Sequence, residues 1–229
     1  MKKAQSQYQE NLLHLSSTFS KILKQRFGKG PETCAVTYHS KRVTVYVRNF
    51  ITPAEEVLVD SGQMNLAINF RNAVMDRVAK EFIREAMVSL DISLDSYYYD
   101  WDYENNTGVM LLQSSTDKYF NEASAIRGKI FNQIMFVSSE VHKVPKRLDL
   151  IRLNQNIVVV ECKGIMLQVE KVLYQKGHLD ILQERSREIK DRYLEYKNVF
   201  ASIFERDVLS IYMAWDYAED SCYIFFYLQ

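Results

Sequence analysis

Gly28-Lys29-Gly30-Pro31 is the segment whose residue types best suit a binding site. Glycines let backbone amides approach an anion, and a lysine adds positive charge. A phosphate-binding loop normally follows a strand and opens a helix. This segment instead follows a predicted helix, whose C-terminal end carries partial negative charge. We therefore favour a helix stop and turn, and keep a small-ligand or anion site built on Gly28, Lys29, Gly30 and Pro31 as the alternative.

Residues 97–103, Tyr-Tyr-Tyr-Asp-Trp-Asp-Tyr, suit either base stacking or core packing. Aromatic side chains on a sheet stack nucleic-acid bases when basic residues lie near them. This run carries two aspartates instead, and the chain has 29 lysines and arginines against 29 aspartates and glutamates. We predict a packed strand that ends in a turn, where Asp102 bonds local backbone amides. RNA binding is the less favoured reading, and we expect no nucleic-acid partner.

The remaining polar residues form no recognisable catalytic or metal-binding pattern. The acidic residues near the aromatic run do not match the ligand spacing of an EF-hand. The four histidines show neither an HExxH spacing nor a neighbouring GxSxG motif. We therefore expect a non-enzymatic protein with no catalytic residues, no metal and no cofactor.

The cysteines and the hydropathy indicate a cytoplasmic protein. Cys34, Cys162 and Cys222 are odd in number and form no CxxC pair, so we predict reduced thiols. No apolar run approaches the roughly 20 residues that span a bilayer, so we predict no membrane insertion.

The chain repeats one pattern twice. Its two tryptophans lie in Trp101-Asp102-Tyr103 and Trp215-Asp216-Tyr217, and Pro31 and Pro145 each precede their tryptophan by 70 residues. Because further landmarks such as Gly62 and Gly177 also correspond, we predict two tandem domains, 1–116 and 117–229. A short polar linker is expected at 113–118.

The elements that position these residues follow from periodicity. In the first copy, apolar residues at helical spacing predict a helix over 9–27, and two β-rich runs, 34–38 and 43–47, predict a hairpin. Thr52 and Pro53 begin a helix that reaches about residue 87 and is bent or interrupted at Gly62. A second hairpin, 93–101 and 108–112, closes the unit.

This order predicts the α+β class. Each copy is expected to form a four-stranded antiparallel sheet with helices on one face, and the two copies are expected to pack as a pseudo-dimer. Alternation places Trp101 and Trp215 on the core face of their strands. The opposite positions are expected to be more solvated: Tyr98, Asp100, Asp102, Tyr212, Ala214 and Asp216.

Two segments of the first copy resemble the bacterial MpsC-type domain, named for a proposed Na+-translocating, membrane-potential-generating system. They are Gly-Lys-Gly-Pro-Glu at 28–32 and Phe-Ile-Thr-Pro-Ala-Glu at 50–55, separated by the hairpin. Asn49 stands where the pattern has glycine. The second copy keeps Pro145, Gly164 and Glu170 but lacks the GKG and Thr-Pro elements, so the chain resembles a tandem version.

The resemblance implies a soluble bacterial protein linked to ion or inorganic-carbon transport, and it supplies no catalytic residue. Our leading hypothesis is therefore an accessory or regulatory module that binds a protein partner. An anion or small-ligand sensor using residues 28–31 is the alternative. Assembly beyond the internal pair is left open.

Overall fold

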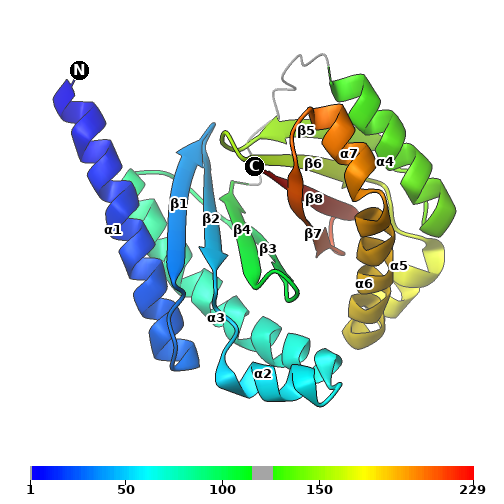
Figure 1. Cartoon of the computed structure of the whole chain (residues 1–229), viewed down its shortest axis with the longest axis horizontal. Coiled ribbons are helices and arrows are strands. Elements are labelled where there is room, and N and C mark those ends of the chain that lie inside the picture. Colours follow the sequence, from blue (N-terminus) through cyan, green and yellow to red (C-terminus); the bar gives the residue numbers. More distant parts are fainter. Residues whose placement is uncertain (1, 115–125) are drawn as a thin grey trace. The chain divides into compact units, whose positions relative to one another are not determined.

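The computed structural model describes residues 2–114 and 126–229, which form two compact units. Residues 115–118 of the expected linker lie outside the described residues. The elements of the first unit are α1 (Lys2–Phe27), β1 (Thr33–His39), β2 (Arg42–Arg48), α2 (Pro53–Asp60), α3 (Met64–Leu90), β3 (Ser96–Asp102) and β4 (Thr107–Gln113) (Figure 1). Helix α1 begins before the predicted residue 9 because residues 2–8 are mostly good helix formers.

The second unit has the same order with one additional helix. Its elements are α4 (Arg127–Val141), β5 (Arg147–Arg152), β6 (Ile157–Lys163), α5 (Gln168–Gln175), α6 (Leu179–Glu195), α7 (Lys197–Phe204), β7 (Val208–Asp216) and β8 (Ser221–Leu228). The helix that corresponds to α3 is divided at Tyr196, which separates α6 from α7.

Each unit contains one four-stranded antiparallel sheet. The strand orders are β1-β2-β4-β3 and β5-β6-β8-β7, so corresponding strands occupy the same positions in the two sheets. In each unit the last strand of the closing hairpin pairs with the second strand of the first hairpin. The α+β class and the four-stranded antiparallel sheets are confirmed.

In the first unit, α1 and α3 pack on one face of the sheet (Figure 1). The buried cluster on that face joins Phe19 and Phe82 of the helices, whose ring centroids are 4.7 Å apart, to Val45 and Met110 of the strands. Trp101 belongs to this cluster, with 8% of its surface exposed, which confirms the predicted core face.

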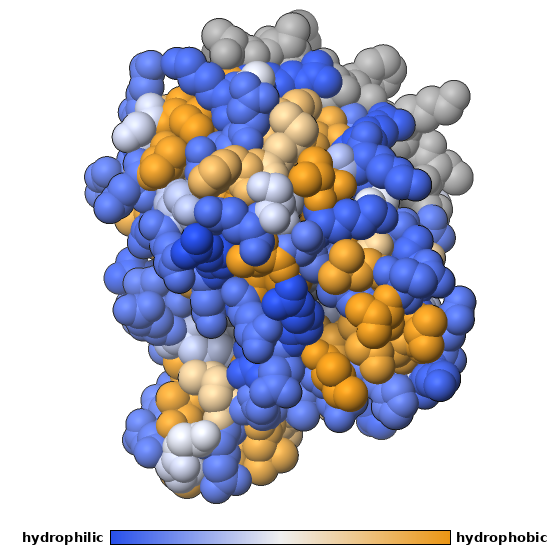
Figure 2. Space-filling view, turned by 90° about the vertical axis from the view of Figure 1, so that its right-hand side faces the viewer, coloured by the Kyte–Doolittle hydropathy of each residue, from blue (hydrophilic) through white to orange (hydrophobic). Residues whose placement is uncertain are grey.

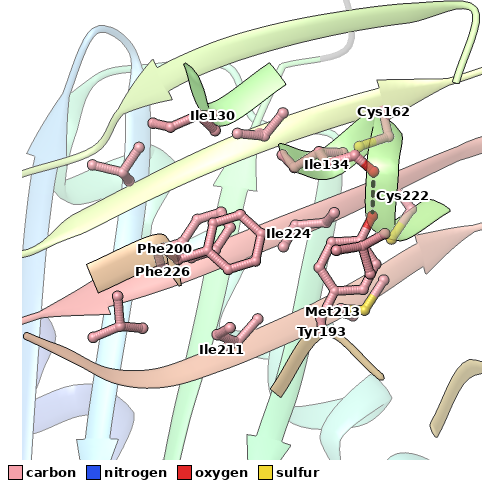
Figure 3. Close-up of a cluster of buried hydrophobic side chains, with 14 of the residues drawn as sticks. Ile130, Ile134, Cys162, Tyr193, Phe200, Ile211, Met213, Cys222, Ile224 and Phe226 are labelled. Atoms are coloured by element: carbon pink, nitrogen blue, oxygen red, sulfur yellow. Dashed lines mark hydrogen bonds between the residues drawn. The ribbon is translucent and has the colours of Figure 1, made fainter. Parts of the chain in front are cut away.

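The core of the second unit is built from α4, α6, α7 and one face of its sheet (Figure 3). Phe200 packs against Phe226 with ring centroids 4.7 Å apart. The Tyr193 hydroxyl is buried among apolar side chains and lies 2.9 Å from the Ser138 hydroxyl and 3.4 Å from the Ile134 carbonyl. These contacts satisfy a polar group that would otherwise be costly to bury.

The expected solvation of the opposite sheet face is wrong for two residues of the second unit. Tyr212 and Ala214 are buried, with 1% and 5% of their surface exposed. Tyr212 belongs to a row across the sheet that is apolar throughout, Ile151, Val159, Phe225 and Tyr212, and the Lys190 ammonium of α6 lies over its ring, 5.8 Å from the centroid. The corresponding row of the first sheet reads Thr37, Thr44, Leu111 and Tyr98 and is more polar.

Candidate functional site

Three loops meet at one end of the first sheet, and the residues that the two copies share are concentrated there. The Lys29 ammonium donates to the Ile51 carbonyl at 2.7 Å. The Asn106 side-chain oxygen accepts from the amides of Phe50 and Ile51 at 2.8 and 2.9 Å. The turn after α1, the loop after β2 and the β3–β4 turn are thus held together.

The second unit repeats this arrangement. Lys143 donates to the Met166 carbonyl at 3.2 Å, and the Asp220 carboxylate accepts from the Met166 amide at 2.7 Å. Asn49 and Gly164 occupy the same position with φ of 55° and 68°. Asparagine tolerates this left-handed conformation better than most residues, which explains how it replaces glycine.

The structure places Gly28, Lys29, Gly30 and Pro31 in the turn between α1 and β1. The Gly28 amide bonds the Lys24 carbonyl at 3.0 Å, and Gly28 has a φ of +78°, as expected of a residue that ends a helix. Lys29 is committed to an internal carbonyl, and Lys143 makes the same bond where both glycines are absent. This geometry supports a lysine that holds the loops together.

A buried ion pair lies beneath the same loops. The Glu55 carboxylate accepts from Arg71 Nε and Nη2, each at 2.6 Å, and from the Thr52 hydroxyl at 2.7 Å. It also accepts from the Thr52 amide at 3.0 Å, which completes the capping box that begins α2. Glu55 and Arg71 have 0% and 2% of their surface exposed.

Four aromatic rings surround the Arg71 guanidinium. Its central carbon lies 3.9 Å from the Trp101 ring centroid, and the rings of Phe50, Tyr103 and Phe27 follow at 5.2, 5.4 and 5.6 Å. Such contacts stabilise a desolvated cation. Burial raises the pKa of the Tyr103 hydroxyl to about 12, against the opposing effect of the Arg71 charge.

Gly108 provides the space for the indole. A Cβ atom at this position would lie 2.1 Å from the Trp101 ring, which is far inside van der Waals contact. The corresponding residue of the second unit is Cys222, which pairs in register with Trp215 as Gly108 does with Trp101. The two indoles therefore cannot pack on their neighbouring strands in the same way.

The second unit keeps the capping carboxylate and changes its cation. Glu170, at the position of Glu55, lies 2.6 Å from His142 Nε2, and Arg185 approaches it at 4.0 Å. Ser186 stands at the position of Arg71. The His142 ring packs edge-on against Trp215, with centroids 5.3 Å apart. Burial raises the pKa of the Glu170 carboxyl, but the His142 bond, the Leu167 amide and nearby positive charge outweigh it and lower the pKa.

The repeat markers Trp101, Asp102, Tyr103, Trp215, Asp216 and Tyr217 are structural in both units. The Asp102 carboxylate accepts from the Asn105 amide at 3.0 Å, and Asp216 accepts from the Glu219 amide at the same distance, so the predicted turns are present. Tyr217 donates to the Leu182 carbonyl at 3.1 Å, tying the turn to α6.

Sequence reasoning missed Arg71, although two signals pointed to it. The acid at Glu55 recurs as Glu170, and an acid kept in a buried first helical turn needs a partner. Arg71 also lies one residue after Phe70 within an otherwise apolar helical pattern, where a charge facing the core is unexpected.

The same region presents apolar side chains at its outer surface. We call residues 53–70 the first elbow and residues 168–185 the second elbow; each consists of a short helix, a glycine turn and the start of a longer helix. Val57 and Leu66 of the first elbow have 67% and 51% of their surface exposed. At the same positions of the second elbow, Val172 and Ile181 have 39% and 46% exposed. Figure 2 shows the helical side of the second unit, where apolar groups lie among hydrophilic ones.

The described residues offer little reactive chemistry. Among them, no cluster of three or more metal-ligating side chains occurs. The three cysteines are not joined in disulfides, and burial raises the pKa of the Cys34 thiol to about 11, which keeps it protonated near neutral pH. No helix in this part of the chain has the length and apolar character needed to cross a bilayer.

The fold and the site together define an α+β protein with two topologically equivalent units, each with a carboxylate at the start of a short helix and aromatic side chains beside it. Residues 9–114 match the family model described as "Na+-translocating membrane potential-generating system (MpsC)". The first unit therefore belongs to the MpsC family. No curated protein and no solved structure matches the chain.

Proposed function

We propose that this protein is a cytoplasmic, non-enzymatic accessory or regulatory module that binds a protein component of a membrane ion or inorganic-carbon transport system. The single observation that carries the proposal is the pair of elbows, which expose apolar residues at equivalent positions in both units. Exposed apolar side chains that recur at equivalent positions favour an interaction site. The family description, which refers to a membrane system, supports the choice of partner class.

Site-specific photo-crosslinking in the native cell tests this function. A photoreactive residue at Leu66 is expected to form an adduct with an integral membrane transport protein. The matched control is Val88, which lies on the same helix and is 84% exposed. Equal adducts from both positions, or no membrane-protein adduct together with turnover of a defined metabolite by the purified protein, would contradict the proposal.

The alternative function is an anion or small-ligand sensor built on residues 28–31. The hydrogen bond from Lys29 to the Ile51 carbonyl gives this alternative no support. Thermal unfolding with phosphate, nucleotides and other anions decides the matter. A ligand-dependent rise in the midpoint temperature of unfolding, abolished by Lys29→Ala, would favour the sensor over the partner-binding module.

A further inference from the structure

The first elbow is a preformed surface. Its turn closes through bonds from the Gln63 amide to the Leu58 carbonyl at 2.7 Å and from the Gly62 amide to the Val59 carbonyl at 3.0 Å. Gly62 has a φ of +74°, which completes a Schellman motif. Together with the Thr52 cap and the Glu55–Arg71 pair, this turn fixes α2 against the start of α3, so that binding requires little ordering of the elbow.

Three exposed apolar side chains lie on this fixed surface. Leu66 and Phe70 are four residues apart on α3 and therefore share one face, and Val57 lies on the preceding helix α2. Phe70, 41% exposed, is held by an edge-on contact with Phe27 at 6.0 Å. Apolar residues at helical spacing are the pattern that an amphipathic partner helix complements.

The charge of the first elbow restricts its partner. Residues 53–70 contain the exposed acids Glu56 and Asp60 and neither lysine nor arginine. This segment therefore offers no cation of its own to anionic lipid headgroups or nucleic-acid phosphates. The second elbow differs, because Lys171 replaces Glu56 and Lys176 replaces Ser61.

We propose that the first elbow binds a cationic amphipathic helix of the partner protein. This inference rests on the proposed function and specifies its partner. Cytoplasmic segments next to transmembrane helices carry an excess of lysine and arginine, so the required chemistry is common in membrane transport proteins. The apolar face of the partner helix covers Val57, Leu66 and Phe70, while its cations face Glu56 and Asp60.

A peptide titration of the full-length protein tests the inference. The probes are a labelled amphipathic helix of leucine and lysine, the same pattern with glutamate for lysine, and a lysine peptide of identical composition with scrambled order. Fluorescence anisotropy is expected to show at least tenfold tighter binding of the amphipathic lysine peptide than of either control. Binding should weaken as the salt concentration rises.

Paired variants localise the binding. The double variant Val57→Ser with Leu66→Ser is expected to weaken peptide binding at least tenfold. The double variant Glu56→Gln with Asp60→Asn is expected to weaken it several-fold and to make the affinity less dependent on salt concentration. The matched control, Val172→Ser with Ile181→Ser in the second elbow, should leave the affinity unchanged. Circular dichroism and the unfolding midpoint verify that each variant is folded.

Three outcomes would overturn the inference. They are equal binding of the scrambled peptide, equal loss in the second-elbow control, and self-association in sedimentation equilibrium that only the first-elbow variants abolish. The last result would identify a second copy as the occupant. If crosslinking from Leu66 still captures a transport protein while the lysine peptide fails to bind, the proposed function stands and only the cationic helix is wrong.

Discussion

The buried Glu55–Arg71 pair and the exposed Arg26–Glu81 pair have equally short contacts but different surroundings. Each has an N–O distance of 2.6 Å, yet the exposed side chains retain 43% and 35% of their surface. Removing one member of a buried pair leaves an uncompensated charge and costs about 3–5 kcal/mol, whereas an exposed pair contributes at most about 1 kcal/mol. Burial therefore decides which of the two pairs matters for folding.

A double-mutant cycle on Glu55 and Arg71 measures this difference. Arg71→Met is expected to lower the free energy of unfolding by about 3–5 kcal/mol, because the Glu55 carboxylate stays buried without its cation. Adding Glu55→Gln should recover part of that loss, since no charge then remains to be desolvated. Urea unfolding provides the measurement, with Arg26→Met as control at under about 1 kcal/mol. Additive losses in the double variant would show that the two residues act independently.

The residue scale is also where the sequence was least informative. The repeated tryptophans, the Asx turns and the Thr52 cap could be predicted because each depends on neighbours within a few positions. The bond from Lys29 to Ile51 and the Glu55–Arg71 pair could not, since they join segments 22 and 16 residues apart. Such contacts depend on where three loops meet, which residue types alone do not determine.

At the scale of elements, the start of α5 depends on a carboxylate that contacts a histidine. Glu170 accepts from the Leu167 amide at 2.8 Å and faces His142 of the segment after α4. Arg185 of α6 lies nearby, and its guanidinium also donates to the Val141 carbonyl. The carboxylate thus joins α4, α5 and α6, and its ionisation should influence how these helices pack.

We expect Glu170→Gln to reduce the acid sensitivity of the protein. The pKa of Glu170 in the folded state lies below its ordinary value of 4.5, so the carboxylate contributes stability above about pH 4.5 that is lost as the pH falls through the lower folded pKa. Urea unfolding should show the variant to be less stable at pH 7, with the two stability curves converging as the pH falls below about 4.5. The control is Glu184→Gln on the exposed side of α6, and its free energy of unfolding should depend on pH as that of the wild type does. A constant difference at every pH would contradict the ion-pair interpretation.

The type and order of the helices and strands could be predicted from the sequence more fully than the residues that pack around them. Periodicity and capping signals located the hairpins and the interruption at Gly62 because these are local features. The division of the second long helix at Tyr196 was not predicted, since no glycine or proline marks it. The burial of Tyr212 was also missed, because alternation along β7 says nothing about the apolar residues that lie beside it on β8 and, one strand further, on β6.

At the scale of the whole molecule, the face of the second sheet opposite its helical core needs explanation. Its central row, Ile151, Val159, Phe225 and Tyr212, is apolar in every strand, although the helices of that unit pack on the other face. If it were left uncovered, an apolar sheet face of this kind would favour aggregation. We propose that it forms the interface of an internal pseudo-dimer, as a single-copy relative would use a two-fold interface.

Separate expression of residues 1–116 and 117–229 tests the pseudo-dimer. We expect the two halves, when mixed, to form a 1:1 complex in size-exclusion chromatography with light scattering, because burying the apolar row removes it from water. Tyr212→Thr in the second half should weaken the complex, whereas Val199→Thr, which introduces the same residue on the exposed surface of α7, should not. Circular dichroism of each half establishes that it is folded before mixing. Folded halves that remain monomeric together would show that the apolar row serves another partner.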